Sequence, residues 1–357
     1  MAGENQKIGL IYLNRKAEGS KPVQRFIDSY KNFDPGVKHE FITIYKGFGV
    51  AEKAIAESFF KGIEHRQLVV DDEMTDIDAY LIAAESFPDI DVFCFLNTFS
   101  EIVCDNWLAI LCDALYSENV GIAGATASYE SLLNSNKLNS KLLWLAGGVL
   151  KYEKKLHLQY ESIIKKHYPN WIRWGVALQF LAIMRNKKID NDNLNIYDAM
   201  FEEYWVSLIK KNGVYEFLTD YPTFPNPHIR SNGFVIRRRH LIPFFDKGRR
   251  MSKMESYLFE SGANSLTRRL IKSQLRAVVA NSTGNIYDVE EWPRSQTFRL
   301  DIQQGLLIQD NQTRNFHKLN SAEKDVNEFM SWGDSSRKIS DRVFTFGIPF
   351  DVDNELI

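Results

Sequence analysis

The chain has few cysteines, no long uninterrupted apolar run and no excess of charge of one sign. Three cysteines, Cys94, Cys104 and Cys112, occur in 357 residues, and no two of them form a CxxC pair. This pattern excludes a disulfide scaffold and favours reduced thiols in a cytoplasmic protein. The formal net charge is −2 and no long stripe of lysine and arginine occurs. A nucleic-acid partner is therefore not expected, because binding to a phosphate backbone needs a basic surface.

Signals for export and for membrane insertion are also lacking. The first residues, MAGENQKIGL, show no basic region followed by an apolar stretch. The most apolar long run, 171–184, is too short to span a bilayer and contains Arg173, so it predicts a core helix, with an interfacial membrane helix as the alternative. The basic amphipathic segment 151–166 predicts a solvated face, and a peripheral contact with the inner face of a membrane is its alternative.

What is present is an alternation of short apolar strands with helical periods. The central unit has two apolar runs, 68–70 and 92–96, separated by residues of helical period. Such a βαβ unit predicts parallel strands that are buried on both faces. The polar residues that follow the two runs are Asp71, Asp72, Thr75 and Asp76, then Asn97, Thr98, Ser100 and Glu101. Ligands of parallel sheets bind at the carboxyl ends of strands, so the pattern predicts a polar, acidic pocket.

The rest of the first 130 residues continues this alternation. We expect further strands at 8–15, 41–45 and 120–125, and helices at 22–33, 51–62 and 105–115, with Ile55, Phe59 and Phe60 of the second helix pointing inward. The layout predicts a doubly wound α/β domain. Lys46 follows one of the strands, where a contact with a ligand and a solvated side chain are both open interpretations.

Two of these segments carry a resemblance to a known family. Residues 70–76, VDDEMTD, resemble the VDDGSTD signature of inverting family 2 glycosyltransferases of the GT-A fold, and the first strand ends in Asn14-Arg15 as in that family. The resemblance implies a Rossmann-like, mostly parallel sheet flanked by helices, with a helical insertion and a C-terminal α+β extension. It also implies a nucleoside diphosphate sugar as donor. The donor-binding candidates are Asn14, Arg15, Lys46, Asp71, Asp72 and Asp76.

The chain departs from the family after the run 92–96. The family has an Asp-x-Asp motif there that binds a divalent metal through the donor diphosphate, whereas this chain reads Asn97-Thr98-Phe99-Ser100-Glu101. Mg²⁺ and Mn²⁺ prefer carboxylate oxygens, which leaves Glu101 as the charged metal candidate beside Asn97 and Ser100. The diphosphate would otherwise be stabilised by lysine and arginine side chains or by backbone amides at a helix start.

A proline-rich approach precedes the second informative segment, 221–239. Residues 229–237 alternate as in a strand, and 231–238 resemble the acceptor-side pattern Gly-x-Asn-x-x-x-Arg-Arg of GT-A enzymes. The resemblance implies that His228, Arg230 and Asn232 contact the acceptor or the diphosphate.

The segment 246–269 follows, where family 2 enzymes place a catalytic carboxylate near a helix start. Glu255 and Glu260 are both candidates for the general base, and the sequence leaves the choice open. Arg249 and Arg268 are candidates for the diphosphate, and Arg249, Arg250 and Lys253 lie in a loop suited to a lid.

Together these features predict a nucleotide-sugar-binding half at 1–131, a helical insertion at 132–220, and an acceptor-binding and catalytic half at 221–357. The predicted activity is inverting transfer of a sugar to a glycan or lipid-linked acceptor in surface polysaccharide assembly. A non-catalytic nucleotide- or glycan-binding protein on a degenerate scaffold is one alternative. A nucleotidyltransferase is another, although the loop 14–19 has a single glycine where such enzymes have a glycine-rich loop.

Overall fold

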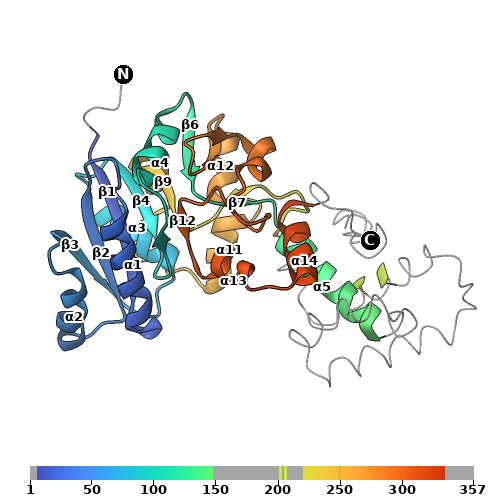
Figure 1. The fold of residues 1–357 in the computed structure, drawn as a ribbon, viewed down its shortest axis with the longest axis horizontal. Coiled ribbons are helices and arrows are strands. Elements are labelled where there is room, and N and C mark those ends of the chain that lie inside the picture. The colour runs from blue at the N-terminus through green and yellow to red at the C-terminus, as the bar shows by residue number, and fades with distance from the viewer. Residues whose placement is uncertain (1–5, 148–200, 203–204, 207–219, 249, 334–357) are drawn as a thin grey trace, which may run out of the picture. The chain divides into compact units, whose positions relative to one another are not determined.

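A computed structural model describes residues 6–147, 201–202, 205–206, 220–248 and 250–333 (Figure 1). The chain divides into two compact units. The first consists of Met1–Ser128 and Pro227–His317, and the second of Tyr129–Asn226 and Lys318–Ile357. Residues 227–317, which the sequence analysis assigned to an acceptor half, thus belong to the same unit as the N-terminal residues.

The first unit contains an eight-stranded sheet in the order β11-β10-β6-β9-β4-β1-β2-β3. Its strands are β1 Ile8–Arg15, β2 Glu40–Lys46, β3 His65–Val70, β4 Val92–Leu96, β6 Val120–Gly124, β9 Phe234–Arg237, β10 Arg276–Ala280 and β11 Ile286–Tyr287. Strands β1 to β4 are parallel, as are β6 and β10, whereas β9 is antiparallel to both β4 and β6. Two short antiparallel pairs accompany the sheet: β5 Glu101–Ile102 with β12 Ile308–Gln309, and β7 Ala127–Ser128 with β8 His228–Ile229.

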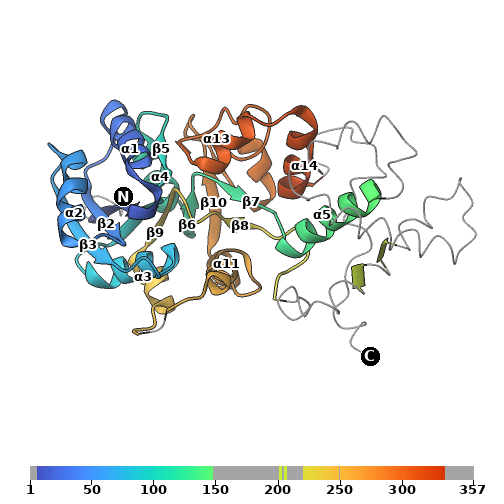
Figure 2. The ribbon, with the colours of Figure 1, turned by 90° about the horizontal axis from the view of Figure 1, so that it is seen from below.

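Helices cover both faces of this sheet. Figure 2 shows α1 and α4 on one face and α3 and α11 on the other. The helices of the unit are α1 Ser20–Asn32, α2 Val50–Glu57, α3 Asp76–Ser86, α4 Trp107–Tyr116, α10 Arg238–Leu241, α11 Lys253–Ser261, α12 Leu266–Lys272 and α13 Asn311–His317. Beneath α1, the rings of Tyr12 and Phe26 stack with centroids 3.8 Å apart, in a core that fills with large apolar side chains. The predicted α/β class, a mostly parallel sheet flanked by helices, is confirmed.

Three local predictions need correction. All five residues of β4 are buried as predicted, but β3 is an edge strand with partly exposed side chains, so it is not buried on both faces. Ile55, predicted to point inward, is 69% exposed because α2 ends after two turns and packs through Ala56. The predicted strand 229–237 is split into β8 and β9, because Gly233 adopts a φ of +69°.

The described part of the second unit is helical. It contains α5 Leu132–Gly147 and α14 Ser321–Trp332, and Asn320 and Glu323 form the capping box of α14. The predicted helices 151–166 and 171–184 lie outside the described residues. Within the described ranges, every helix is too short or too polar to cross a bilayer.

Candidate functional site

The parallel strands β1 to β4 end at the same edge of the sheet, and Thr98 ties two of these ends together. Its hydroxyl donates to the Leu13 carbonyl at 2.7 Å and accepts from the Arg15 amide at 3.3 Å. Its own carbonyl accepts from the Tyr12 hydroxyl at 3.0 Å. The turn that follows β4 is therefore fixed to the end of β1, as expected for neighbouring parallel strands that share a ligand-binding edge.

Residues 71–76, called the acidic turn here, pair with cations from two other strand ends. Arg15 donates to both carboxylate oxygens of Asp72, at 2.7 and 3.2 Å, and Lys46 Nζ lies 2.9 Å from Asp76 Oδ1. The hydrogen bonds and charge of Arg15 lower the pKa of Asp72. Lys46 is 3% exposed, so the interpretation of it as a solvated lysine is wrong. At this edge, Asp72 and Asp76 are thus paired with cations of the chain itself.

A loop from the far part of the chain reaches the same acidic turn. Arg250 contacts Asp71 at 2.8 Å and Glu73 at 3.4 Å, and the Met251 amide donates to both oxygens of Asp78. The Arg250 contacts are between exposed side chains, which makes them weak and exchangeable.

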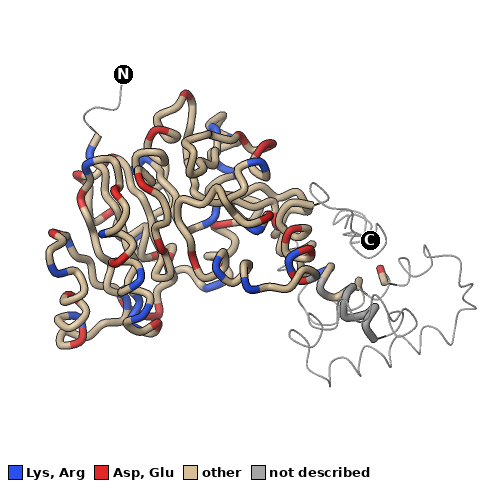
Figure 3. The backbone as a smooth tube through the Cα atoms, viewed as in Figure 1, with Lys and Arg blue, Asp and Glu red and all other residues tan. Residues whose placement is uncertain are grey.

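Basic and acidic residues are interspersed throughout the described chain (Figure 3).

Asn14 lies directly before Arg15 and is 1% exposed. Among the described residues, none accepts a hydrogen bond from its Nδ2. A buried donor without an acceptor costs free energy, so this amide is a local destabilising feature at the end of β1.

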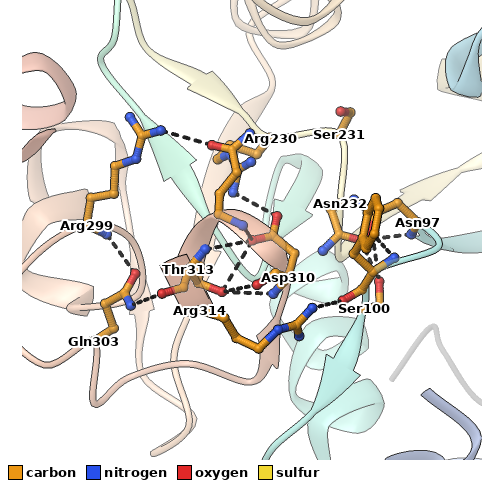
Figure 4. A network of polar contacts seen from close by, with 12 residues as sticks. Asn97, Ser100, Arg230, Ser231, Asn232, Arg299, Gln303, Asp310, Thr313 and Arg314 are labelled. Atoms are coloured by element: carbon orange, nitrogen blue, oxygen red, sulfur yellow. Dashed lines mark hydrogen bonds and ion pairs between the residues drawn. The ribbon is translucent and has the colours of Figure 1, made fainter. Parts of the chain in front are cut away.

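Residues 97–101, called the amide turn here, are held by a neutral network (Figure 4). Asn232 Oδ1 accepts from the Asn97 amide at 2.8 Å and from the Ser100 hydroxyl at 2.7 Å. Asn97 Oδ1 in turn accepts from the Phe99 amide at 2.9 Å. Ser100 and Asn232 are buried, so β9 and the amide turn form one rigid connection.

Two ion pairs flank the amide turn, and both use residues of the segment 299–317. Arg314 Nη1 lies 2.9 Å from Glu101 Oε2, and Arg230 Nη1 lies 3.2 Å from Asp310 Oδ2. Burial would raise the pKa of Asp310, but the charge of Arg230 and hydrogen bonds from Thr313 outweigh it and the pKa is lowered. Arg230 also stacks over Phe298, at 4.2 Å from the ring centroid.

The two candidate bases differ in their surroundings. Glu255 closes the capping box at the start of α11, where it accepts from the Ser252 amide at 2.7 Å. Glu260, near the end of the same helix, accepts from the amide and the hydroxyl of Ser231, at 3.0 and 3.1 Å. It also lines a small pocket, together with Arg230 and Phe234. Ser231 is the neighbour of Asn232, whose side chain binds the amide turn, so its two hydrogen bonds hold Glu260 close to that turn.

The other predicted site residues are less informative. His228 is buried in β8, where it pairs with Ser128 of β7, and Arg268 lies in α12, where burial lowers its pKa. Arg249 lies outside the described residues.

The sequence analysis missed residues that hold the site together. Thr98 and Ser231 stood inside quoted motifs, but hydroxyl partners give no sequence signal of their own. Arg314 contacts Glu101 across a separation of 213 residues. Asp78 was overlooked as well, although its place after Thr75 at the start of a helical period fits a capping box.

No family model and no curated protein matches the chain. Among solved structures, TarS of S. aureus matches with 12% identity over 33% of this chain and 21% of its own, with a TM-score of 0.27. A cytidylyltransferase from Leptospira borgpetersenii matches with 14% identity over 33% of this chain and 53% of its own, with a TM-score of 0.26. Mouse xyloside xylosyltransferase 1 matches with 9% identity over 33% of this chain and 52% of its own, with a TM-score of 0.25. The matched part thus spans between about a fifth and about half of these proteins. The likeness is one of fold and says nothing of activity.

Proposed function

We propose that this protein is an inverting glycosyltransferase that moves a sugar from a nucleoside diphosphate sugar to a hydroxyl of a glycan or lipid-linked acceptor, in surface polysaccharide assembly. The observation that carries the proposal is the meeting of three features at one edge of the sheet. These are the acidic turn with its cations, the amide turn, and a glutamate held beside the amide turn through Ser231 and Asn232.

The acidic turn supplies the groups that a nucleotide needs. Carboxylates of Asp71 and Asp72 accept hydrogen bonds from ribose hydroxyls or from N–H groups of a base. Arg15 and Lys46 hold Asp72 and Asp76 at the same strand ends through ion pairs.

Glu260 is the general base in this proposal. Its carboxylate takes the proton of the acceptor hydroxyl while the hydroxyl oxygen forms a bond to the anomeric carbon. The bond from that carbon to the diphosphate oxygen breaks on the opposite side, so the configuration inverts and the diphosphate leaves as an anion. Glu255 is a weaker candidate because its carboxylate is used to cap α11.

Ligand binding tests the donor site without knowledge of the acceptor. We would measure the melting temperature of the protein with UDP, GDP, CDP, dTDP and their sugars, because a ligand that binds the native state raises it. A shift with one nucleotide and none with the others supports the proposal and names the base. A protein that binds none of them is not a transferase of this kind.

Slow hydrolysis of the bound nucleotide sugar tests the catalytic role. We expect Glu260→Gln to lower the rate by about 100-fold or more, which is the contribution of a positioned general base. Glu255→Gln is the matched control on the same helix and should change the rate little. Binding without hydrolysis in the unaltered protein would instead indicate a binding protein on a degenerate scaffold.

A further inference from the structure

The amide turn offers poor ligands to a divalent metal. Asn97, Phe99 and Glu101 are its partly exposed positions, while Thr98 and Ser100 are buried. The two carboxylates of an Asp-x-Asp motif that followed β4 directly would stand at 97 and 99, but here these positions hold an amide and a benzene ring. The Asn97 oxygen already accepts from the Phe99 amide. A hard cation that prefers several charged oxygens does not fit this turn.

The carboxylates nearby are committed to other partners. Glu101 Oε2 lies 2.9 Å from Arg314 Nη1 and 3.8 Å from Arg25 Nε. Asp310 is 2% exposed and accepts from Arg230 and from the amides of Gln312 and Thr313. Within the described ranges, no three His, Cys, Asp or Glu side chains are grouped closely enough to hold a metal ion. A metal would therefore have to displace an arginine from a partner it already has.

Two arginines nevertheless place positive charge next to the turn. Arg25 of α1 and Arg314 of α13 share the single carboxylate of Glu101, which leaves one positive charge in excess. The guanidinium of Arg314 also donates to the Phe99 carbonyl at 2.9 Å, so it is fixed to the turn itself. Guanidinium groups bind phosphate oxygens by charge-assisted hydrogen bonds and stay protonated.

We infer that the amide turn binds the donor diphosphate without a divalent metal, with the excess charge of Arg25 and Arg314 in the metal's place. The inference rests on the proposed function, since it needs a nucleotide donor. In this arrangement the two arginines stabilise the negative charge that develops on the leaving diphosphate, as preorganised cations do in other phosphate-transfer sites.

Calorimetric titration with the nucleoside diphosphate selected by the melting-temperature screen tests the inference. We expect its Kd in EDTA to lie within about threefold of its Kd in Mn²⁺ or Mg²⁺, a change of about 0.65 kcal/mol at most. Binding that appears only with a metal overturns the inference but leaves the proposed function intact. Absence of binding under both conditions overturns the proposed function and the inference with it.

Variants identify the source of the charge. Arg25→Gln and Arg314→Gln should each weaken binding of the diphosphate about tenfold, the loss of roughly one charge-assisted contact, and leave binding of the corresponding nucleoside unchanged. Arg276→Gln is the matched control, because Arg276 pairs with Asp288 and lies on β10, which β6 and β9 separate from β4. The Arg25 side chain is 44% exposed, so its variant remains informative even if the Arg314 variant does not fold. Equal losses for nucleoside and diphosphate, or no loss from Arg25→Gln, would contradict the assignment.

Discussion

The acidic turn and the amide turn lie at the same sheet edge, yet they are built in opposite ways. The acidic turn has exposed carboxylates that pair with basic side chains from other parts of the chain, with Arg250 shared by Asp71 and Glu73. The amide turn is held by buried amide and hydroxyl groups. Glu101 at its end and Asp310 beside it form ion pairs with arginines. Exposed ion pairs exchange partners at little cost, whereas a buried network is expensive to open. We therefore expect the acidic turn to rearrange around a ligand while the amide turn stays rigid.

The largest difference in stability should come from the two arginine pairs. Arg230→Met leaves the buried Asp310 carboxylate without its countercharge, and we expect a loss of about 3–5 kcal/mol in the free energy of unfolding. Arg250→Met removes the exposed partner of Asp71 and should cost less than about 1 kcal/mol. Urea denaturation measures both. Similar values for the two variants would show that the turns do not differ in rigidity.

A second stability effect concerns the centre of the amide turn. Asn232→Ala removes the acceptor of the Asn97 amide and of the buried Ser100 hydroxyl, and we expect a loss of about 1–3 kcal/mol. Asn285→Ala, at an exposed asparagine of the same unit, is the control and should be nearly neutral. Thermal unfolding followed by circular dichroism compares them, and a neutral Asn232 variant would sink the idea of a rigid turn.

The pH dependence of stability tests the buried ion pair between Arg230 and Asp310 in another way. Because the pKa of Asp310 is lowered in the folded state, its contribution is complete above the unfolded value of about 3.9 and is lost as pH falls through the folded value. In the double variant Arg230→Met with Asp310→Asn this loss is absent. We expect the double variant to lose less stability below about pH 4, by roughly 1.4 kcal/mol for each pH unit by which the fold lowers the pKa of Asp310. Parallel unfolding curves between pH 6 and pH 3 would refute the assignment.

The sequence predicts the strands that position the site because their apolar runs are short and bounded by polar residues. The strand predicted at 92–96 matches β4, and the carboxylates after 68–70 follow β3. Parallel strands end at a common edge, so the meeting of Arg15 and Asp72 follows from their places in the two strands.

Other features of the site have no local signal. Alternation in 229–237 hides the turn before β9, because a single glycine with positive φ interrupts a pattern that is otherwise continuous. The Arg314 contact with Glu101 depends on where α13 packs, and the burial of Lys46 depends on the helix that brings Asp76. The choice of Glu260 over Glu255 as the general base likewise depends on the structure, because the carboxylate of Glu255 already caps the start of α11.

The smallest effect on stability belongs to the acidic turn itself. Asp72→Asn keeps the shape of a side chain that is 47% exposed and weakens its pairing with Arg15, so the free energy of unfolding should fall by less than about 1 kcal/mol. The same variant should lose much of the melting-temperature increase caused by the selected nucleotide, because the carboxylate is a ligand contact in the proposed function. Glu291→Gln, whose glutamate pairs with Arg294 within one helical turn, is the control and should keep that increase. An undiminished increase in the Asp72 variant would mean that the nucleotide does not bind to the acidic turn, even though the ion pairs of this turn exchange partners more easily than the buried network of the amide turn.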